Sequence, residues 1–385
     1  MRAMDNRVVE FRTTRFQFAR ERPIGDSQVR TEVANVAALE LVDGRGLVGL
    51  GFVQSLFNPL PAEGEIARIF ASEVWPSVEG QSPLGLVHRV SRPRGGNRRP
   101  FSLPFEEALQ VALWDLTAKQ AGLPLHRMLG ATRDRVRVYA SGLDFHLSDD
   151  AFSELFGRAD ALGYSAFKIK VGHPDFERDL HRLNLLARSV RPDATIMVDA
   201  NEAWGPKEAL VKLAAMRDAG YRIEWAEDPI LRDDFAGLRF LRDAATGTLI
   251  NSGEYLNVDG KRRLMLAGGV DVLNVHGFVT DVMRIGWLAA ELGVAVSLGN
   301  TFLEFGVHMA CALPEVGWLE YSFQNFEHLV EQPIEMRDGW IYAPDRPGHG
   351  LVLAESARRD WSRPTVLGAT ALGAAPANRY LKTAL

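Results

Sequence analysis

Short apolar runs recur from about residue 131 to residue 330, at intervals of 22 to 30 residues. The stretches between them have helical periodicity, for example residues 152–163 and 207–220. An apolar strand followed by an amphipathic helix at this interval is the unit of a parallel β/α fold. The runs begin near Val136, Ala166, Thr195, Ile223, Leu249, Asp271, Val294 and Trp318. Eight such units predict a (β/α) barrel of the TIM type.

The first 130 residues have a different pattern. Residues 29–53 alternate like two antiparallel strands joined by a turn at Asp43–Gly44. This stretch contains the spacing Gly44-x-Gly46-x-x-Gly49, but a dinucleotide-binding fingerprint must open a helix after a strand. A second strand follows here instead, so we reject that interpretation. Residues 104–122 have helical periodicity and end at a glycine, which predicts a small α+β domain ahead of the barrel.

Beyond residue 330 the helical rhythm ends, and strand and turn residues return in IEMRDGWIYAPDRPGHG. The predicted fold class is therefore α/β, a modified (β/α) TIM-type barrel with an N-terminal α+β capping domain. We expect residues 1–130 to form the capping domain and residues 131–330 to form the barrel with the active site. Residues 331–385 are expected to return to the capping domain and complete it.

Composition narrows the function classes only a little. The chain has 385 residues, 46% of them hydrophobic and 24% charged, with a net charge of −5, which gives no reason to expect nucleic acid as a partner. A single cysteine, Cys311, excludes an intrachain disulfide and a cysteine-based metal cluster. The N-terminal residues lack an apolar targeting segment, and no later stretch has transmembrane length. We expect a cytoplasmic protein with no membrane partner.

Three acidic residues follow apolar runs at nearly equal spacing. Asp199, Glu227 and Glu254 lie 28 and 27 residues apart, and Lys168 and Lys170 lie one unit upstream on one face of their strand. Taken singly, an acidic residue after a strand is often the N-cap of the next helix. A strand with two lysines on one face is often an edge strand whose face is solvated. In a parallel barrel, however, strand C-termini converge on one bowl. Carboxylates crowded there repel unless a cation lies among them, and oxygen ligands suit Mg²⁺.

These motifs resemble the enolase superfamily, in its mandelate racemase and muconate-lactonizing branch. KIK, VDAN, AEDP and SGE stand in the order and at the spacing of that family, and the likeness spans nearly the whole chain. The resemblance implies that Asp199, Glu227 and Glu254 bind one Mg²⁺ per subunit, which stabilises an enediolate. It also implies that Lys170 is the base that removes the proton α to a substrate carboxylate, and that Lys168 helps to depress its pKa.

The chemistry of the reaction agrees with that set of residues. A proton α to a carboxylate is too weakly acidic for an unaided side chain to remove, so a preorganised cation at the developing enediolate is needed. A lysine is a useful base only when it is deprotonated, which requires burial or a neighbouring cation.

The far side of the bowl departs from both known patterns of the branch. Gly299 and Asn300 stand where the racemase pattern has a histidine, and His276 stands where the muconate-lactonizing pattern has a second lysine. By resemblance, Glu320 in WLEY contacts the substrate carboxylate, with Glu304 as the rival for that role. His276 has the alternative of a core histidine that bonds a backbone carbonyl, and Glu320 that of a surface residue.

Asn300, Asn201, Arg20 and Arg22 are further candidates for substrate binding. Asn201 is either a site residue or a turn residue. In this family loops of the capping domain select the substrate, and Arg20 and Arg22 lie in one candidate loop. Residues 52–61 form a second candidate loop. The basic stretch 92–99 is either a solvated loop or a clamp for a distal carboxylate or polyhydroxyl group.

We predict a Mg²⁺-dependent enzyme, a lyase or an isomerase. The preferred reaction is dehydration of a hydroxylated acid, such as a sugar acid, to a 2-keto-3-deoxy acid, with Lys170 as base and His276 as acid. Racemase, epimerase or cycloisomerase chemistry on a carboxylate is the alternative. A TIM-barrel metal hydrolase would favour histidine ligands, and a non-catalytic relative would have lost Lys170 or a ligand. The expected partners are a small-molecule carboxylate substrate and further copies of the chain.

Overall fold

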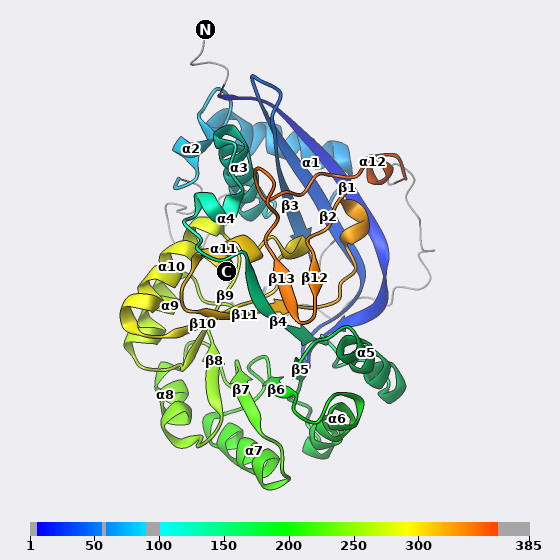
Figure 1. Ribbon diagram of the computed structural model, residues 1–385, viewed down its shortest axis with the longest axis vertical. Helices are drawn as coiled ribbons and strands as arrows, with labels where there is room; N and C mark the ends of the chain where they lie inside the picture. Colours follow the sequence, from blue (N-terminus) through cyan, green and yellow to red (C-terminus); the bar gives the residue numbers. More distant parts are fainter. Residues whose placement is uncertain (1–5, 56–58, 90–100, 361–385) are drawn as a thin grey trace.

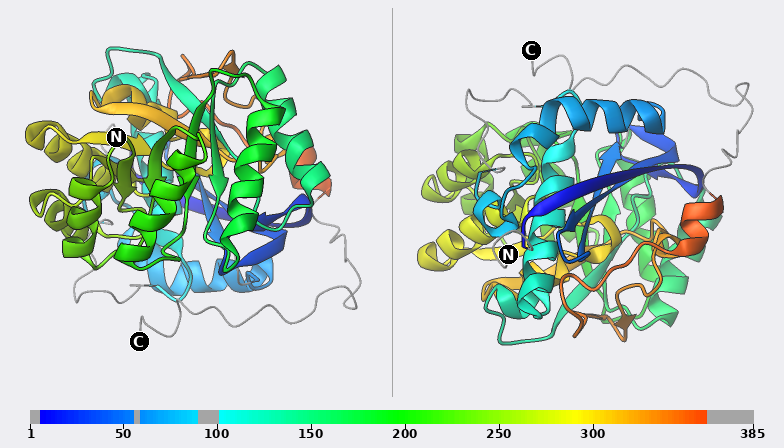
Figure 2. Two further views of the ribbon diagram at one scale, coloured as in Figure 1. Left: turned by 90° about the horizontal axis from the view of Figure 1, so that it is seen from below. Right: turned by 90° about the horizontal axis from the view of Figure 1, so that it is seen from above.

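The computed structural model describes residues 6–55, 59–89 and 101–360. Its N-terminal part is a three-stranded antiparallel sheet of β1 (Val8–Gly25), β2 (Arg30–Asp43) and β3 (Val48–Ser55), in the order β1-β2-β3. Helices α1 (Glu63–Ile69), α2 (Pro83–Leu86) and α3 (Phe105–Ala121) accompany this sheet. Seen from above, sheet and helices lie over the barrel as a capping domain (Figures 1 and 2).

The hairpin and the helix predicted for this region are confirmed. The β2–β3 turn spans the residues between Asp43 and Val48, and α3 ends at Gly122, which has a left-handed backbone. The rejected glycine motif has a packing role, since β3 lies directly on α3. A Cβ atom at Gly49 would collide with the carbonyl oxygen of Ala112. Only glycine lets strand and helix approach this closely.

The barrel consists of eight parallel strands in sequence order, and β11 pairs with β4 to close it. The strands begin within two residues of the positions predicted from the apolar runs. They are β4 (Arg135–Ser141), β5 (Ala166–Lys170), β6 (Thr195–Asp199), β7 (Ile223–Glu227), β8 (Leu249–Ser252), β9 (Val272–Val275), β10 (Ala295–Leu298) and β11 (Val316–Tyr321). The predicted barrel with a capping domain is confirmed.

Helices cover the outside of the barrel and bury its apolar faces. Four of the helices named below begin at a side-chain cap, Ser148, Asp175, Asp234 or Asn257, whose oxygen accepts from the first turn. The helices are α4 (Leu125–Met128), α5 (Asp149–Ala161), α6 (Phe176–Ser189), α7 (Pro206–Asp218), α8 (Phe235–Ala244), α9 (Val258–Leu266), α10 (Val279–Leu292) and α11 (Val307–Ala312). Among the described residues, none of the helices is both long and apolar enough to cross a membrane.

The segment after the barrel contacts both parts of the protein. Strands β12 (Met336–Arg337) and β13 (Trp340–Tyr342) form a hairpin that pairs antiparallel with β4. The chain then reaches the capping domain, where His349 donates its N–H to Asp115 of α3 and its ring bonds the carbonyl of Leu50. Helix α12 (Glu355–Asp360) follows beside β1 (Figures 1 and 2). The domain boundaries at residues 130 and 330 stay predictions.

Candidate active site

The C-terminal ends of the barrel strands share one backbone feature. The chain takes a positive φ within a few residues of the end of each strand, so it turns sharply over the bowl. These residues are Leu143, Gly172, Asn201, Asp228, Gly253, Gly277, Leu303 and Phe323. At a residue other than glycine this conformation costs on the order of 1–3 kcal/mol and tends to occur at functional sites.

Lys168 lies in the middle of a buried group of carboxylates. Its Nζ is 2.6 Å from Glu227 Oε1, 3.2 Å from Glu320 Oε1 and 3.4 Å from Asp199 Oδ2, and its side chain is 1% exposed. Burial by itself would lower the pKa of Lys168, but the carboxylates outweigh burial and raise this pKa well above its ordinary value. This ammonium is therefore held protonated and neutralises part of the surrounding negative charge.

Lys170, two residues along the same strand, contacts a smaller set of groups. Its Nζ donates to Asp199 Oδ2 at 2.6 Å and to Asn201 Oδ1 at 2.7 Å. Burial and the neighbouring Lys168 both lower the pKa of Lys170, as expected from the sequence, but Asp199 outweighs them and the pKa is raised. A free base at Lys170 thus requires that Asp199 give its charge to another cation.

The three predicted metal ligands come from consecutive units of the barrel. Asp199 ends β6, Glu227 ends β7 and Glu254 follows β8. Burial, together with the neighbouring carboxylates, raises the pKa of Glu227 well above its ordinary value and that of Glu254 to about 7. The pKa of Asp199 is lowered, because Lys170 and Lys168 outweigh its burial.

The chemistry of this donor set fits a hard divalent cation. All the donors are carboxylate oxygens, and Glu227 Oε2 is buried without a hydrogen-bond partner. Within the described ranges, no three histidine, cysteine or acidic side chains are already arranged to hold a metal ion. Lys168 and Lys170 hydrogen-bond to carboxylate oxygens of Glu227 and Asp199.

His276 lies on the opposite side of the bowl from Lys170. It follows β9, which is four strands from β5 in either direction around the closed barrel. Its Nε2 is 3.8 Å from Glu254 Oε1, and its side chain is 36% exposed. Burial lowers the pKa of His276, while the carboxylate of Glu107 opposes that effect.

Gly299 at the end of β10 explains why this histidine stands on β9. A Cβ atom at position 299 would lie 3.1 Å from Asn274 Oδ1 and 3.3 Å from His276 Cβ, tighter than ordinary contact. A histidine on β10, as in the racemase pattern, would therefore compete with His276 for the same space.

Glu320 and Glu304 are placed differently. Glu320 ends β11 inside the bowl, where Oε1 pairs with Lys168 and Oε2 accepts the N–H of Asn300 at 3.0 Å. The pKa of Glu304 is raised by its burial and by Glu327, outside the lysine cluster. Glu320 therefore lies with the lysines and carboxylates of the bowl, and which of the two contacts a substrate stays a prediction.

Asn201 is both a turn residue and a part of the bowl. It has φ of 45°, and its side chain accepts from Lys170 and donates to the hydroxyl of Tyr255 at 3.1 Å. Its carbonyl accepts from Gln28 Nε2 at 2.6 Å, which attaches the loop after β1 to the bowl.

The prediction that Arg20 and Arg22 lie in a loop is wrong, because both are on strand β1, and they do not join the lysines and carboxylates of the bowl. The guanidinium of Arg20 donates to Gln324 Oε1 and lies over the ring of Phe326, and that of Arg22 donates to the carbonyl of Ser322. These contacts connect β1 to the segment after the last barrel strand. The candidate basic stretch 92–99 and residues 56–58 lie outside the described residues.

Other residues of the bowl were not found from the sequence. Asn274 of β9 donates to Glu227 Oε1 at 3.0 Å, and Asp26 in the loop after β1 is close enough to Lys170 and Asp199 for their charges to affect its pKa. Asn274 stands two residues before His276 on one strand face, a signal that could have indicated it. Asp26 gives no such signal, because only the folded loop brings it to the lysines.

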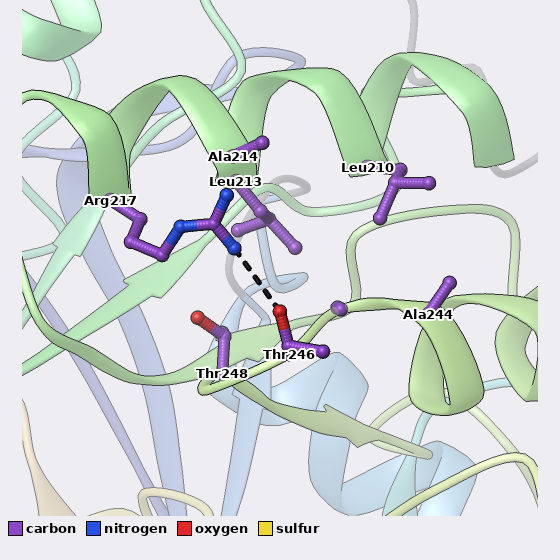
Figure 3. Close-up of a pocket in the computed structure, with 8 residues that line it drawn as sticks. Leu210, Leu213, Ala214, Arg217, Ala244, Thr246 and Thr248 are labelled. Carbon is purple, nitrogen blue, oxygen red and sulfur yellow. Dashed lines mark hydrogen bonds between the residues drawn. The ribbon is translucent and has the colours of Figure 1, made fainter.

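Two pockets lie outside this group of lysines and carboxylates. A small one of about 20 Å³ lies between α7 and α8, where Arg217 donates to Thr246, and holds no acid–base group that could serve the bowl (Figure 3). The second, of about 270 Å³, lies between the capping domain and the barrel, beside the loop that carries His276. Its lining residues are Phe52, Gln54, Pro104, Glu106, Glu107 and Phe278.

A family model described as "Enolase C-terminal domain-like" matches residues 151–357, which span the site and more than half of the chain. The chain belongs to this family. Both the family and the branch predicted from the motifs are therefore confirmed. The relatives below place the protein among enzymes of the lyase and isomerase kinds, as predicted.

Three relatives illustrate the range of this family. The L-talarate/galactarate dehydratase of Salmonella typhimurium is 29% identical over 361 residues, covering 89% of this chain and 88% of the relative. Its structure with Mg and L-lyxarohydroxamate has a TM-score of 0.78 at 26% identity, covering 92% of each chain. The 3,6-anhydro-alpha-L-galactonate cycloisomerase of Streptomyces coelicolor is 31% identical over 253 residues, 64% of this chain and 68% of the relative. A candidate mandelate racemase from Mesorhizobium loti is 66% identical, with a TM-score of 0.90, covering 97% of this chain and 99% of that structure.

Proposed function

We propose that this protein removes the proton α to a substrate carboxylate in a Mg²⁺-dependent reaction. The preferred overall reaction is dehydration of a hydroxylated sugar acid to a 2-keto-3-deoxy acid. The observation that carries this proposal is the placement of Lys170 and His276 on strands that face each other across one bowl of carboxylates. A substrate between them meets a base on one side and an acid on the other.

Asp199, Glu227 and Glu254 are the residues that would hold Mg²⁺. The structure of the Salmonella dehydratase contains Mg, which supports this metal as the cofactor. A divalent cation in this position supplies the positive charge that stabilises an enediolate. Glu320 and Asn300 lie at the side of the bowl where the substrate carboxylate would be bound.

The protonation state of Lys170 depends on the charge of Asp199. In the structure, Asp199 holds the proton on Lys170. Once the charges of Asp199 and Glu254 are neutralised, burial and the Lys168 ammonium both lower the pKa of Lys170, and Asp26 still opposes them. Lys168 would stay protonated through Glu320 and act on its neighbour electrostatically. Lys170 then serves as the general base.

His276 decides between elimination and inversion. An imidazole with a lowered pKa is mostly neutral at pH 7, yet it can still deliver a proton to a leaving hydroxide after it gains one from solvent. The same ring could instead return a proton to the α-carbon from the opposite face. Racemisation or epimerisation is therefore the second candidate, and the likeness to the Mesorhizobium candidate racemase favours keeping it.

Proton NMR in D₂O separates the two reactions. Hydroxy acids and acyl amino acids would be screened with Mg²⁺ for formation of a 2-keto acid and for exchange at the α-carbon. With a substrate found in this way, His276→Asn should abolish keto acid formation and retain Lys170-dependent deuterium exchange. If the wild type instead accumulates the opposite stereoisomer, deuterated at the α-carbon and without keto product, the dehydratase proposal is wrong and His276 is a second base.

A further inference from the structure

Lys261 is a buried lysine whose ammonium faces backbone and no carboxylate of the bowl directly. It lies on α9, is 5% exposed, and donates to the carbonyl oxygens of Gly253, Glu254 and Leu256. The bonds to Glu254 and Leu256 are 3.3 and 2.7 Å long. A lysine ammonium has three protons, so these three carbonyls match its whole donor capacity.

The backbone that Lys261 holds is the segment that carries Glu254. This segment leaves β8 through Gly253, whose φ is 119°, and it enters α9 at the Asn257 cap. Its side facing the barrel is fixed by Asp228, which accepts the N–H of Gly253 at 3.3 Å, and by the bond between Asn201 and the hydroxyl of Tyr255. Without the ammonium, the carbonyls of Glu254 and Leu256 would lose this donor, whereas that of Gly253 would keep the N–H of Leu256 at 3.1 Å.

We propose that Lys261 is a positioning residue that fixes the backbone of residues 253–256 and thereby holds the Glu254 carboxylate ready to bind Mg²⁺. This inference rests on the proposed role of Glu254 as a metal ligand. Lys261 acts through the backbone, because the three hydrogen bonds of its ammonium go to backbone oxygens. Groups that orient metal ligands typically change metal affinity 10–100-fold when they are removed.

The test compares Lys261→Met with a matched control, Lys119→Met. Lys119 is also a largely buried lysine, and its Nζ donates to the carbonyl of Val48 at 2.8 Å and to Asp115 at 2.6 Å in the capping domain. Both variants lose backbone hydrogen bonds and should lose stability. Isothermal titration with Mg²⁺ alone should show a dissociation constant raised roughly 10–100-fold for Lys261→Met and unchanged for Lys119→Met.

Activity gives a second readout that loss of stability does not produce. With a turned-over substrate, Lys261→Met should require more Mg²⁺ for half-maximal rate and should recover most of its kcat at saturating Mg²⁺. If Lys261→Met does not fold, Lys261→Gln, which keeps two donors, should show an intermediate dissociation constant.

The outcomes distinguish this inference from the proposed function. An unchanged Mg²⁺ dissociation constant in Lys261→Met, or in Lys261→Gln where the first does not fold, overturns the positioning role. An equal weakening in Lys119→Met also overturns it, because the effect would then follow general stability. Absence of Mg²⁺ binding in the wild type would overturn the proposed function itself.

Discussion

Replacing Lys168 with methionine should destabilise the metal-free protein more than any other single change at the lysine pair. Methionine fills a similar volume but removes the charge that lies within 3.4 Å of Glu227, Glu320 and Asp199. Breaking a buried ion pair by removing one partner costs about 3–5 kcal/mol, because the other charge stays buried and uncompensated. Here three carboxylates lose their shared partner, so we expect the upper part of this range.

Lys170→Met is the matched variant. Lys170 has one carboxylate in direct contact, and Asp199 would keep Lys168 at 3.4 Å. The loss of unfolding free energy in Lys170→Met should be about half of that in Lys168→Met, a few kcal/mol at most. Lys207→Met, at an exposed position of α7, should leave the stability unchanged within about 0.5 kcal/mol.

Thermal unfolding in EDTA and in excess Mg²⁺ measures these differences. In EDTA, Lys168→Met should unfold roughly 10 °C below the wild type, given about 2–4 °C per kcal/mol for a unit of barrel size. Added Mg²⁺ should raise its midpoint more than that of the wild type, because the cation takes over the charge that the lysine supplied. If Lys168→Met is as stable in EDTA as Lys207→Met, or if its unfolding midpoint falls less than that of Lys170→Met, the electrostatic account of this cluster is wrong.

Three further results are expected. Glu227→Gln removes a charged ligand, so Mg²⁺ binding measured by calorimetry should weaken and turnover should stop, while the circular dichroism spectrum should stay unchanged. Full activity of the wild type after exhaustive chelation would contradict the metal role. Lys170→Ala should lose α-proton exchange in D₂O, whereas Lys168→Ala should mainly shift the basic limb of kcat/KM; the opposite pattern would reverse the two assignments. Burial lowers the pKa of His308 to about 3, so this histidine stays neutral in the folded protein, whereas in the unfolded chain it binds a proton below about pH 6.5. The contribution of His308 to stability should therefore be complete above that pH and should fall as the pH decreases towards 3. His308→Gln should show a weaker pH dependence of the unfolding midpoint.

The sequence by itself determined the architecture and the acidic centre of this protein. Strand and helix periods are local properties, so the apolar runs indicated all eight barrel strands to within two residues of their starts. The C-terminal ends of parallel strands meet at one end of a barrel, and therefore Asp199, Glu227 and Lys170 could be expected together from spacing alone. The prediction that a strand and not a helix follows the glycine-rich turn was also sufficient to reject a dinucleotide-binding fingerprint at that turn.

Only the tertiary structure decided what each of these side chains contacts. Lysine side chains are long, and whether Asp199 pairs more closely with Lys170 or with Lys168 depends on a difference in distance of less than 1 Å. The contacts of Arg20 with the segment after β11 join residues about 300 positions apart. Lys261 finds its three carbonyls only because α9 folds back on the loop that precedes it. Such contacts depend on the packing of distant or folded-back segments, which a local pattern of polar and apolar residues does not encode.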